Sequence, residues 1–161
     1  MLYNEGMKVL DTLIKLLPTR TVYAHCDIPC GIYDPTPAQI AAHTVLRMMQ
    51  FLKEAEGDIN KTVRIIHVKE EHAEIVKHEI EIIWGDYFKE ENSKDVPDLA
   101  DKVWKILKLA SKCKQGTDEA VAKELLTAVQ EFAEIFWKSK GLEPVRIPSS
   151  YPTEGVIVSH K

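Results

Sequence analysis

The chain has 161 residues, of which 45% are hydrophobic and 29% are charged, the balance of a soluble globular domain with one core. Its formal net charge of −4 is too small to indicate nucleic acid or an anionic membrane surface as a partner. Because no run of about 18 uninterrupted apolar residues is present, we expect no membrane-spanning helix.

The amino-terminal segment, 1–24, carries a short apolar helical stripe that ends at Pro18. Ala24 resembles the small residue before a secretory cleavage site. However, Asp11 and Lys15 interrupt the apolar centre that a secretory signal requires. We therefore expect a packing helix or a cytoplasmic leader, with secretion as the less favoured alternative.

The next segment, from His25 to Pro37, contains three prolines and a glycine within thirteen residues. This composition excludes a regular helix or strand and predicts an ordered hook or a loop. Cys26 and Cys30 lie four residues apart, directly after His25. Two thiolates and an imidazole are soft donors that suit copper, zinc and nickel better than magnesium or calcium. The spacing alone leaves open the alternative of two thiols that bind no metal.

The order of residues in this segment favours one metal. A chain cut after Ala24 would begin at His25 and offer an amine, an imidazole and the next backbone amide nitrogen. Together with the sulfurs of Cys26 and Cys30, these donors form a tetragonal set that nickel(II) accepts. Anionic thiolate and amide donors also stabilise the trivalent state, so such a nickel ion could be redox-active.

The remainder of the domain is predicted to contain four amphipathic helices, at about 37–57, 59–88, 97–116 and 117–141, with Thr117 able to cap the last. Short loops between them predict an all-α fold, an antiparallel up-and-down four-helix bundle that spans 37–140 and carries the hook, 25–36, at its amino terminus. The first helix is expected to present one apolar face made of Ile40, Thr44, Met48, Leu52 and Ala55.

The tail, 141–161, has three prolines and no helical period, so we expect it to be extended. Cys113 falls on the apolar face of the third helix and is predicted to be a buried structural thiol. An odd and sparse set of three cysteines also argues against a disulfide framework. The helical histidines, His43, His67 and His78, are expected to be surface or hydrogen-bonded side chains and not metal ligands.

The segment HCDIPCGIYDP, residues 25–35, resembles the nickel-binding hook of the nickel superoxide dismutases, whose pattern is H-C-D-x-P-C-G-x-Y-D-P. Every fixed position of that pattern is present. The segments VKEEHAEIVKHEIEIIWGDYFK, at 68–89, and EIFWKSK, at 134–140, are similar to the second and last helices of the same family. The resemblance therefore covers about 25–140.

This resemblance implies a metal site and a maturation step. The leader, 1–24, would be removed by a processing protease, and nickel would be bound by the amine and imidazole of His25, the amide nitrogen and sulfur of Cys26, and the sulfur of Cys30. The ion would cycle between its divalent and trivalent states while superoxide is converted to oxygen and hydrogen peroxide. Pro29 would hold the turn of the hook, and Gly31 would let the chain leave the metal without a side-chain clash.

The resemblance also implies supporting residues, an assembly and a compartment. Tyr33 would stand before the open face of the nickel, and Asp86, Tyr87 and Lys89 would support the site from the second helix. Lys89 could attract the anionic substrate, although a plain surface charge is an equal alternative. The family assembles as a homohexamer, which we expect here, and the cytoplasm is the favoured compartment.

Two positions depart from the family pattern. Ala41 stands where a glutamate often orients the axial imidazole, and His72 stands where an arginine is common. As a hypothesis, His72 or a backbone carbonyl replaces the missing hydrogen-bond partner of His25.

Other classes of protein fit the sequence less well. A non-catalytic nickel-storage or nickel-delivery protein remains the alternative, and a pure interaction bundle leaves the hook unexplained. A di-iron carboxylate bundle needs Glu-x-x-His pairs and a zinc protease needs His-Glu-x-x-His, and the chain contains neither.

Overall fold

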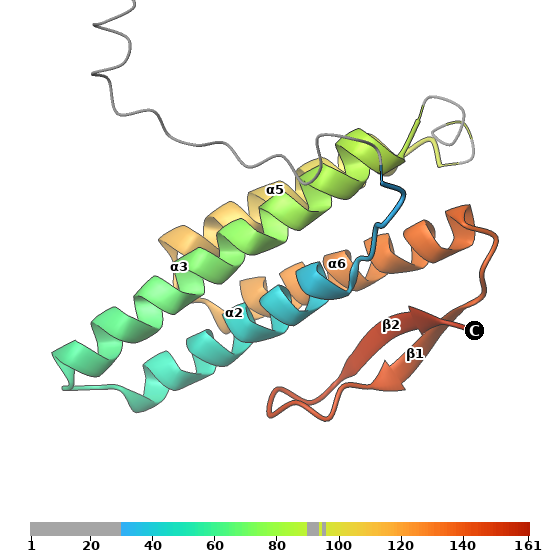
Figure 1. Ribbon diagram of the computed structural model, residues 1–161. Helices are drawn as coiled ribbons and strands as arrows, with labels where there is room; N and C mark the ends of the chain where they lie inside the picture. The colour runs from blue at the N-terminus through green and yellow to red at the C-terminus, as the bar shows by residue number, and fades with distance from the viewer. Residues whose placement is uncertain (1–29, 90–93, 95) are drawn as a thin grey trace, which may run out of the picture. The chain divides into compact units, whose positions relative to one another are not determined.

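The computed structural model describes residues 30–89, 94 and 96–161 (Figure 1). The chain divides into two units, Met1–Cys30 and Gly31–Lys161, and the second contains all of the described helices and strands. The predicted leader, together with His25, Cys26 and Pro29, lies outside the described residues.

Among the described residues of the second unit, four α-helices form the bundle: α2 (Thr36–Glu54), α3 (Ile59–Ile82), α5 (Leu99–Gln115) and α6 (Glu119–Ser139). α3 continues into a π-helical turn, η1 (Ile83–Tyr87). Each helix packs against the next in the chain, and α6 returns to pack against α2 (Figure 1). The predicted up-and-down four-helix bundle is therefore confirmed.

The capping residues explain where the helices begin. Asp58 accepts a hydrogen bond from the backbone nitrogen of Lys61 at 2.9 Å and caps α3. The carboxylate of Asp118 accepts one from the nitrogen of Ala120 at 2.8 Å and caps α6. The prediction of Thr117 as this cap was wrong by one residue, because either side chain can serve and the sequence does not say which one turns toward the helix.

The core face of α2 also differs from the prediction. The buried residues of this helix include Ala38, Ala41, Ala42, Val45, Leu46 and Met49. Ile40, predicted to face the core, is 44% exposed. The physical reason is that Gln39 and His43 are buried against the tail, whereas polar residues are normally expected on the solvent-exposed face of a helix. Burial of these two polar residues rotates the true core face around the helix.

The tail forms an antiparallel hairpin of β1 (Pro144–Pro148) and β2 (Val156–His160), whose strands are extended as predicted. In Figure 1 this red hairpin lies beside the orange helix α6, and both strands contact that helix. Gln39 donates to the carbonyl of Val158 at 2.9 Å and accepts from its nitrogen at 2.7 Å. Gln39 therefore pairs with the outer edge of β2 as a neighbouring strand would.

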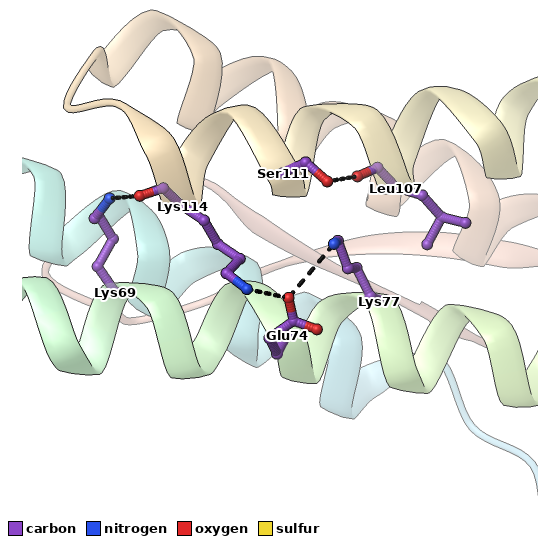
Figure 2. A network of polar contacts seen from close by, with 6 residues as sticks. All are labelled: Lys69, Glu74, Lys77, Leu107, Ser111 and Lys114. Carbon is purple, nitrogen blue, oxygen red and sulfur yellow. Dashed lines mark hydrogen bonds and ion pairs between the residues drawn. The ribbon is translucent and has the colours of Figure 1, made fainter.

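One buried charge closes the end of α5. The ammonium group of Lys69, on α3, donates to the carbonyl oxygens of Cys113, Lys114 and Gly116 at 2.5, 2.7 and 2.8 Å. Figure 2 shows this contact with Lys114, together with the ion pairs that Glu74 makes with Lys114 and Lys77. The final carbonyls of a helix lack partners within the helix, so Lys69 supplies them from the neighbouring helix.

Candidate metal centre

The described part of the predicted hook begins at Cys30. Cys30 carries an exposed thiol, and Gly31 adopts a φ of +72°. A residue with a side chain is strained at this φ, whereas glycine adopts it without cost. The expectation that Gly31 lets the chain leave the metal without a side-chain clash stays a prediction.

The residues that follow are fixed to the start of α2. A side-chain oxygen of Asp34 accepts a hydrogen bond from the backbone nitrogen of Thr36 at 2.7 Å. Pro35 is buried and occupies the N-cap position of α2, and a second proline stands in the first turn. This rigid Asp-Pro-Thr-Pro segment holds Tyr33 at the amino-terminal end of α2.

Tyr33 and Tyr87, which are 54 positions apart in sequence, come together in the fold. Their ring centroids are 5.6 Å apart, with an angle of 55° between the ring planes. Both side chains are half-buried. Tyr87 also packs against Phe88 and Phe136, with centroids at 5.0 and 4.8 Å. The two tyrosines predicted from the resemblance therefore form part of one aromatic cluster.

The π-helical turn brings Tyr87 to this place. The backbone nitrogen of Phe88 donates to the carbonyl of Ile83 at 3.2 Å, a five-residue closure that is wider than an α-helical turn. Such turns are rare and occur frequently at functional sites. Nothing in the spacing of apolar residues along α3 predicts it.

Two residues at the carboxyl end of α6 hold this cluster and were missed by the sequence reasoning. The hydroxyl of Tyr87 lies 2.9 Å from the hydroxyl oxygen of Ser139, which donates to the carbonyl of Phe136 at 2.7 Å. The ammonium group of Lys140 lies 4.8 Å from the ring centre of Phe136 and 5.6 Å from that of Tyr87. It also donates to the carbonyl of Tyr33 at 3.5 Å. The available signal was the segment 134–140, whose resemblance to the family covers both residues.

The other predicted support residues lie at the surface or elsewhere on the helices. Asp86 and Lys89 flank Tyr87 in sequence and are exposed. Ala41 is buried and has no polar atom on its side chain. His72 lies fifteen residues before Tyr87, which corresponds to about 22 Å along α3. Its Nδ1 donates to the carbonyl of Val68 at 2.9 Å, so His72 is not part of the tyrosine cluster within one chain.

Cys113 behaves as a structural thiol, as predicted. It is fully buried, and this burial raises the pKa of the thiol to about 11. At neutral pH the sulfur therefore stays protonated. Over the described residues, no cluster of three His, Cys, Asp or Glu side chains could hold a metal ion. None of the helices in that part of the chain is long and apolar enough to cross a membrane.

His43 is a hydrogen-bonded histidine, also as predicted. Its Nε2 donates to the carbonyl of Val156 at 3.2 Å, and its Nδ1 lies 2.7 Å from the hydroxyl of Thr153. Because a carbonyl can only accept, Nε2 carries the proton in the neutral ring, and the threonine donates to Nδ1. Burial lowers the pKa of His43, so the neutral form is favoured.

Comparisons with known proteins agree with the sequence resemblance. The family model for nickel-containing superoxide dismutase matches residues 20–140. Nickel superoxide dismutases from Streptomyces seoulensis and Streptomyces coelicolor are each 37% identical over 123 residues, which cover 76% of this chain and 93% of those proteins.

Solved structures agree as well. A native nickel superoxide dismutase structure has a TM-score of 0.69 and 34% identity, and covers 73% of this chain and 99% of that one. An apo structure has a TM-score of 0.66 with 32% identity, and covers 69% and 99%. The residues matched by the family model include the hook segment and both tyrosines, and they end before the hairpin.

Proposed function

Because this chain belongs to the nickel-containing superoxide dismutase family, we propose that its mature form disproportionates superoxide at a nickel ion held by the hook, 25–36. The supporting observation is that the family match runs unbroken over the hook and the whole bundle, 20–140. Within that span, every fixed position of the hook pattern is present. The overall reaction consumes two superoxide anions and two protons and yields one dioxygen and one hydrogen peroxide.

The proposed ligands are the terminal amine and imidazole of His25, the backbone nitrogen and sulfur of Cys26, and the sulfur of Cys30. Nickel held there would supply one-electron chemistry between its divalent and trivalent states. Two observations support this set. Cys30 is exposed, and the glycine after it adopts a positive φ that favours glycine over other residues.

Removal of the leader, 1–24, is part of the proposal. While Ala24 remains attached, the backbone nitrogen of His25 is an amide and cannot act as an amine ligand. Cleavage before His25 by a processing protease would create that ligand. The leader would therefore keep the chain inactive until it is cut.

The tyrosines are proposed to control what reaches the metal. Tyr33 lies only three residues beyond Cys30, and its ring is held against that of Tyr87. Two phenol groups at this position can hold water or hydrogen peroxide and narrow the entry to small molecules. Asp86 and Lys89 are exposed beside Tyr87, and the positive charge of Lys89 would raise the encounter rate with an anion.

We also propose a homohexamer in the cytoplasm, as expected from the family. The half-exposed apolar residues on the outer face of α2, among them Ile40, support an assembly that covers them. The proposal also needs a hydrogen-bond partner for the imidazole of His25. Ala41 has no polar atom, and the ring of His72 already donates to its own helix, so a backbone carbonyl is the better candidate.

The test compares nickel-loaded protein that begins at His25 with the full-length chain. Fast superoxide turnover by the trimmed form alone is the expected result. A Cys30→Ser variant of the trimmed form should lose both nickel and activity, whereas Cys113→Ser should keep both. Tight nickel binding without turnover in the trimmed form would instead indicate a storage or delivery protein.

A further inference from the structure

The hydrogen bond between Tyr87 and Ser139 has a direction that the surrounding atoms determine. A serine hydroxyl has one proton, and the hydroxyl of Ser139 donates it to the carbonyl of Phe136 at 2.7 Å. That carbonyl can only accept. The proton in the 2.9 Å contact between Ser139 and Tyr87 must therefore come from the phenol. Tyr87 donates and Ser139 accepts.

The ring of Tyr87 has little freedom to change this arrangement. Its faces and edges meet the rings of Tyr33, Phe88 and Phe136, with centroid distances of 4.8–5.6 Å. Lys140 places its ammonium group near the rings of Tyr87 and Phe136 and also donates to the carbonyl of Tyr33. The carboxyl end of α6 thus fixes both the position of the Tyr87 ring and the direction of its hydroxyl proton.

We propose that Ser139 is a positioning residue that turns the phenol proton of Tyr87 inward, so that Tyr87 offers only oxygen lone pairs to the site. In this state Tyr87 accepts a hydrogen bond from water or hydrogen peroxide. It gives none to an anion such as superoxide, azide or chloride. This inference rests on the proposed function, because it assigns Tyr87 the role of hydrogen-bond acceptor toward water or hydrogen peroxide at the nickel site. Lys140 supports the arrangement by bonding the carbonyl of Tyr33, whose ring packs against Tyr87.

The plain alternative is a serine that only bonds its own helix. Serine and threonine residues often donate to a carbonyl one turn back, as Ser111 does to Leu107 at 3.0 Å on α5 (Figure 2). Ser111 therefore provides a control: it also donates to a carbonyl of its own helix, four residues back where Ser139 reaches three, but it has no tyrosine partner among the described contacts. A role in positioning requires that Ser139 and Ser111 differ when each is replaced.

The first measurement uses the full chain without metal. The Raman ring doublet of tyrosine changes its intensity ratio according to whether the phenol donates or accepts, and the difference spectrum against Tyr87→Phe isolates this residue. We expect a donor signature in the wild type and in Ser111→Ala, its loss in Ser139→Ala, and its return in Ser139→Thr. An acceptor signature in the wild type, or an unchanged signal in Ser139→Ala, would overturn the inference.

The second measurement uses the nickel-loaded, trimmed protein and azide as the anion. Without Ser139 the phenol proton can turn outward and donate to an anion, so azide should bind roughly tenfold more tightly to Ser139→Ala. Ser139→Thr should bind azide as the wild type does, and adding Tyr87→Phe to Ser139→Ala should abolish the gain. Equal azide affinity in all variants would contradict the inference. If the protein failed to turn over superoxide, the Raman result would still decide the direction of the bond.

Discussion

Replacement of Lys69 by methionine tests whether the buried ammonium group holds the end of α5. The side chain is 2% exposed, and its three bonds reach carbonyls of Cys113, Lys114 and Gly116. Methionine matches the length of the stem but cannot donate. The contact with Cys113 is fully buried and the other two are partly buried, so water can replace only some of the lost bonds. Hydrogen bonds from a charged donor contribute about 1.5–3 kcal/mol each, and a carbonyl left without a partner costs about 1–3 kcal/mol.

Since these terms are not additive and burial of the charge is itself unfavourable, we expect Lys69→Met to lower the free energy of unfolding by about 2–4 kcal/mol. At fixed protein concentration, this would move the urea midpoint down by roughly 1–2 M. Lys114→Met is the matched control, because it removes a charge from the same helix end that only pairs with Glu74 near the surface. Its cost should stay under about 1 kcal/mol. If both variants lost the same stability, the three carbonyls would not depend on Lys69.

Three further predictions concern the hairpin and the cysteines. Gln39→Leu removes both bonds to Val158 and should cost about 2–4 kcal/mol in urea unfolding, with far-UV circular dichroism of the helices retained; no loss would mean that water satisfies the strand. Because burial lowers the pKa of His43 below 6.5, the unfolded chain binds the proton more readily than the folded chain. The contribution of His43 to the free energy of unfolding should therefore be fully present above pH 6.5 and fall as the pH drops below that value. His43→Gln should flatten this dependence between pH 7.5 and 5, and an unchanged slope would assign it to another group. At pH 7.5 a thiol reagent should modify Cys30 quickly and Cys113 only on unfolding, because the first is exposed and the second is buried with a pKa of about 11.

Much of the bundle could be predicted from the sequence because its signals are local. Glycine, proline and capping residues predicted each helix to within a few residues, and Cys113 was correctly placed on the core face of α5. The prediction failed on α2, where two apolar stripes compete. The choice between them depends on Gln39 and His43, whose burial is explained only by a hairpin more than a hundred residues later in the chain.

The candidate site divides in the same way. The resemblance assigned Tyr33 and Tyr87 to one site without saying that they touch, and in the fold their ring centroids are 5.6 Å apart. Ser139 and Lys140 could not be chosen from the sequence, because polar residues at the end of a helix usually face solvent. Their contact with Tyr87 depends on the π-helical turn at the end of α3, which no periodicity reveals.

The hairpin follows the end of the family match at residue 140. Its hydrogen bonds show how a small sheet is kept from pairing with further strands. Backbone hydrogen bonds join Lys161 to Glu143 and Ser149 to Gly155 at the two ends of the hairpin. Because hydrogen-bonded pairs alternate along an antiparallel ladder, the odd-numbered residues of β1 direct their N–H and C=O groups toward β2. The even-numbered residues of β1 therefore direct their backbone groups away from β2. Two of these three residues, Pro144 and Pro148, have no N–H group that a further strand could bond.

The opposite edge is satisfied by the bundle. Val158 of β2 directs its backbone N–H and C=O away from β1, and the side-chain amide of Gln39 bonds both of these groups. One edge thus keeps only the backbone donor of Arg146 and the other is occupied, which is how natural proteins limit edge-to-edge aggregation. A hairpin protected in this way gains its stability from α2 and α6 and not from a wider sheet. It follows that its loss should expose Gln39, His43 and the adjoining face of α2 while leaving the contact between Tyr33 and Tyr87 intact.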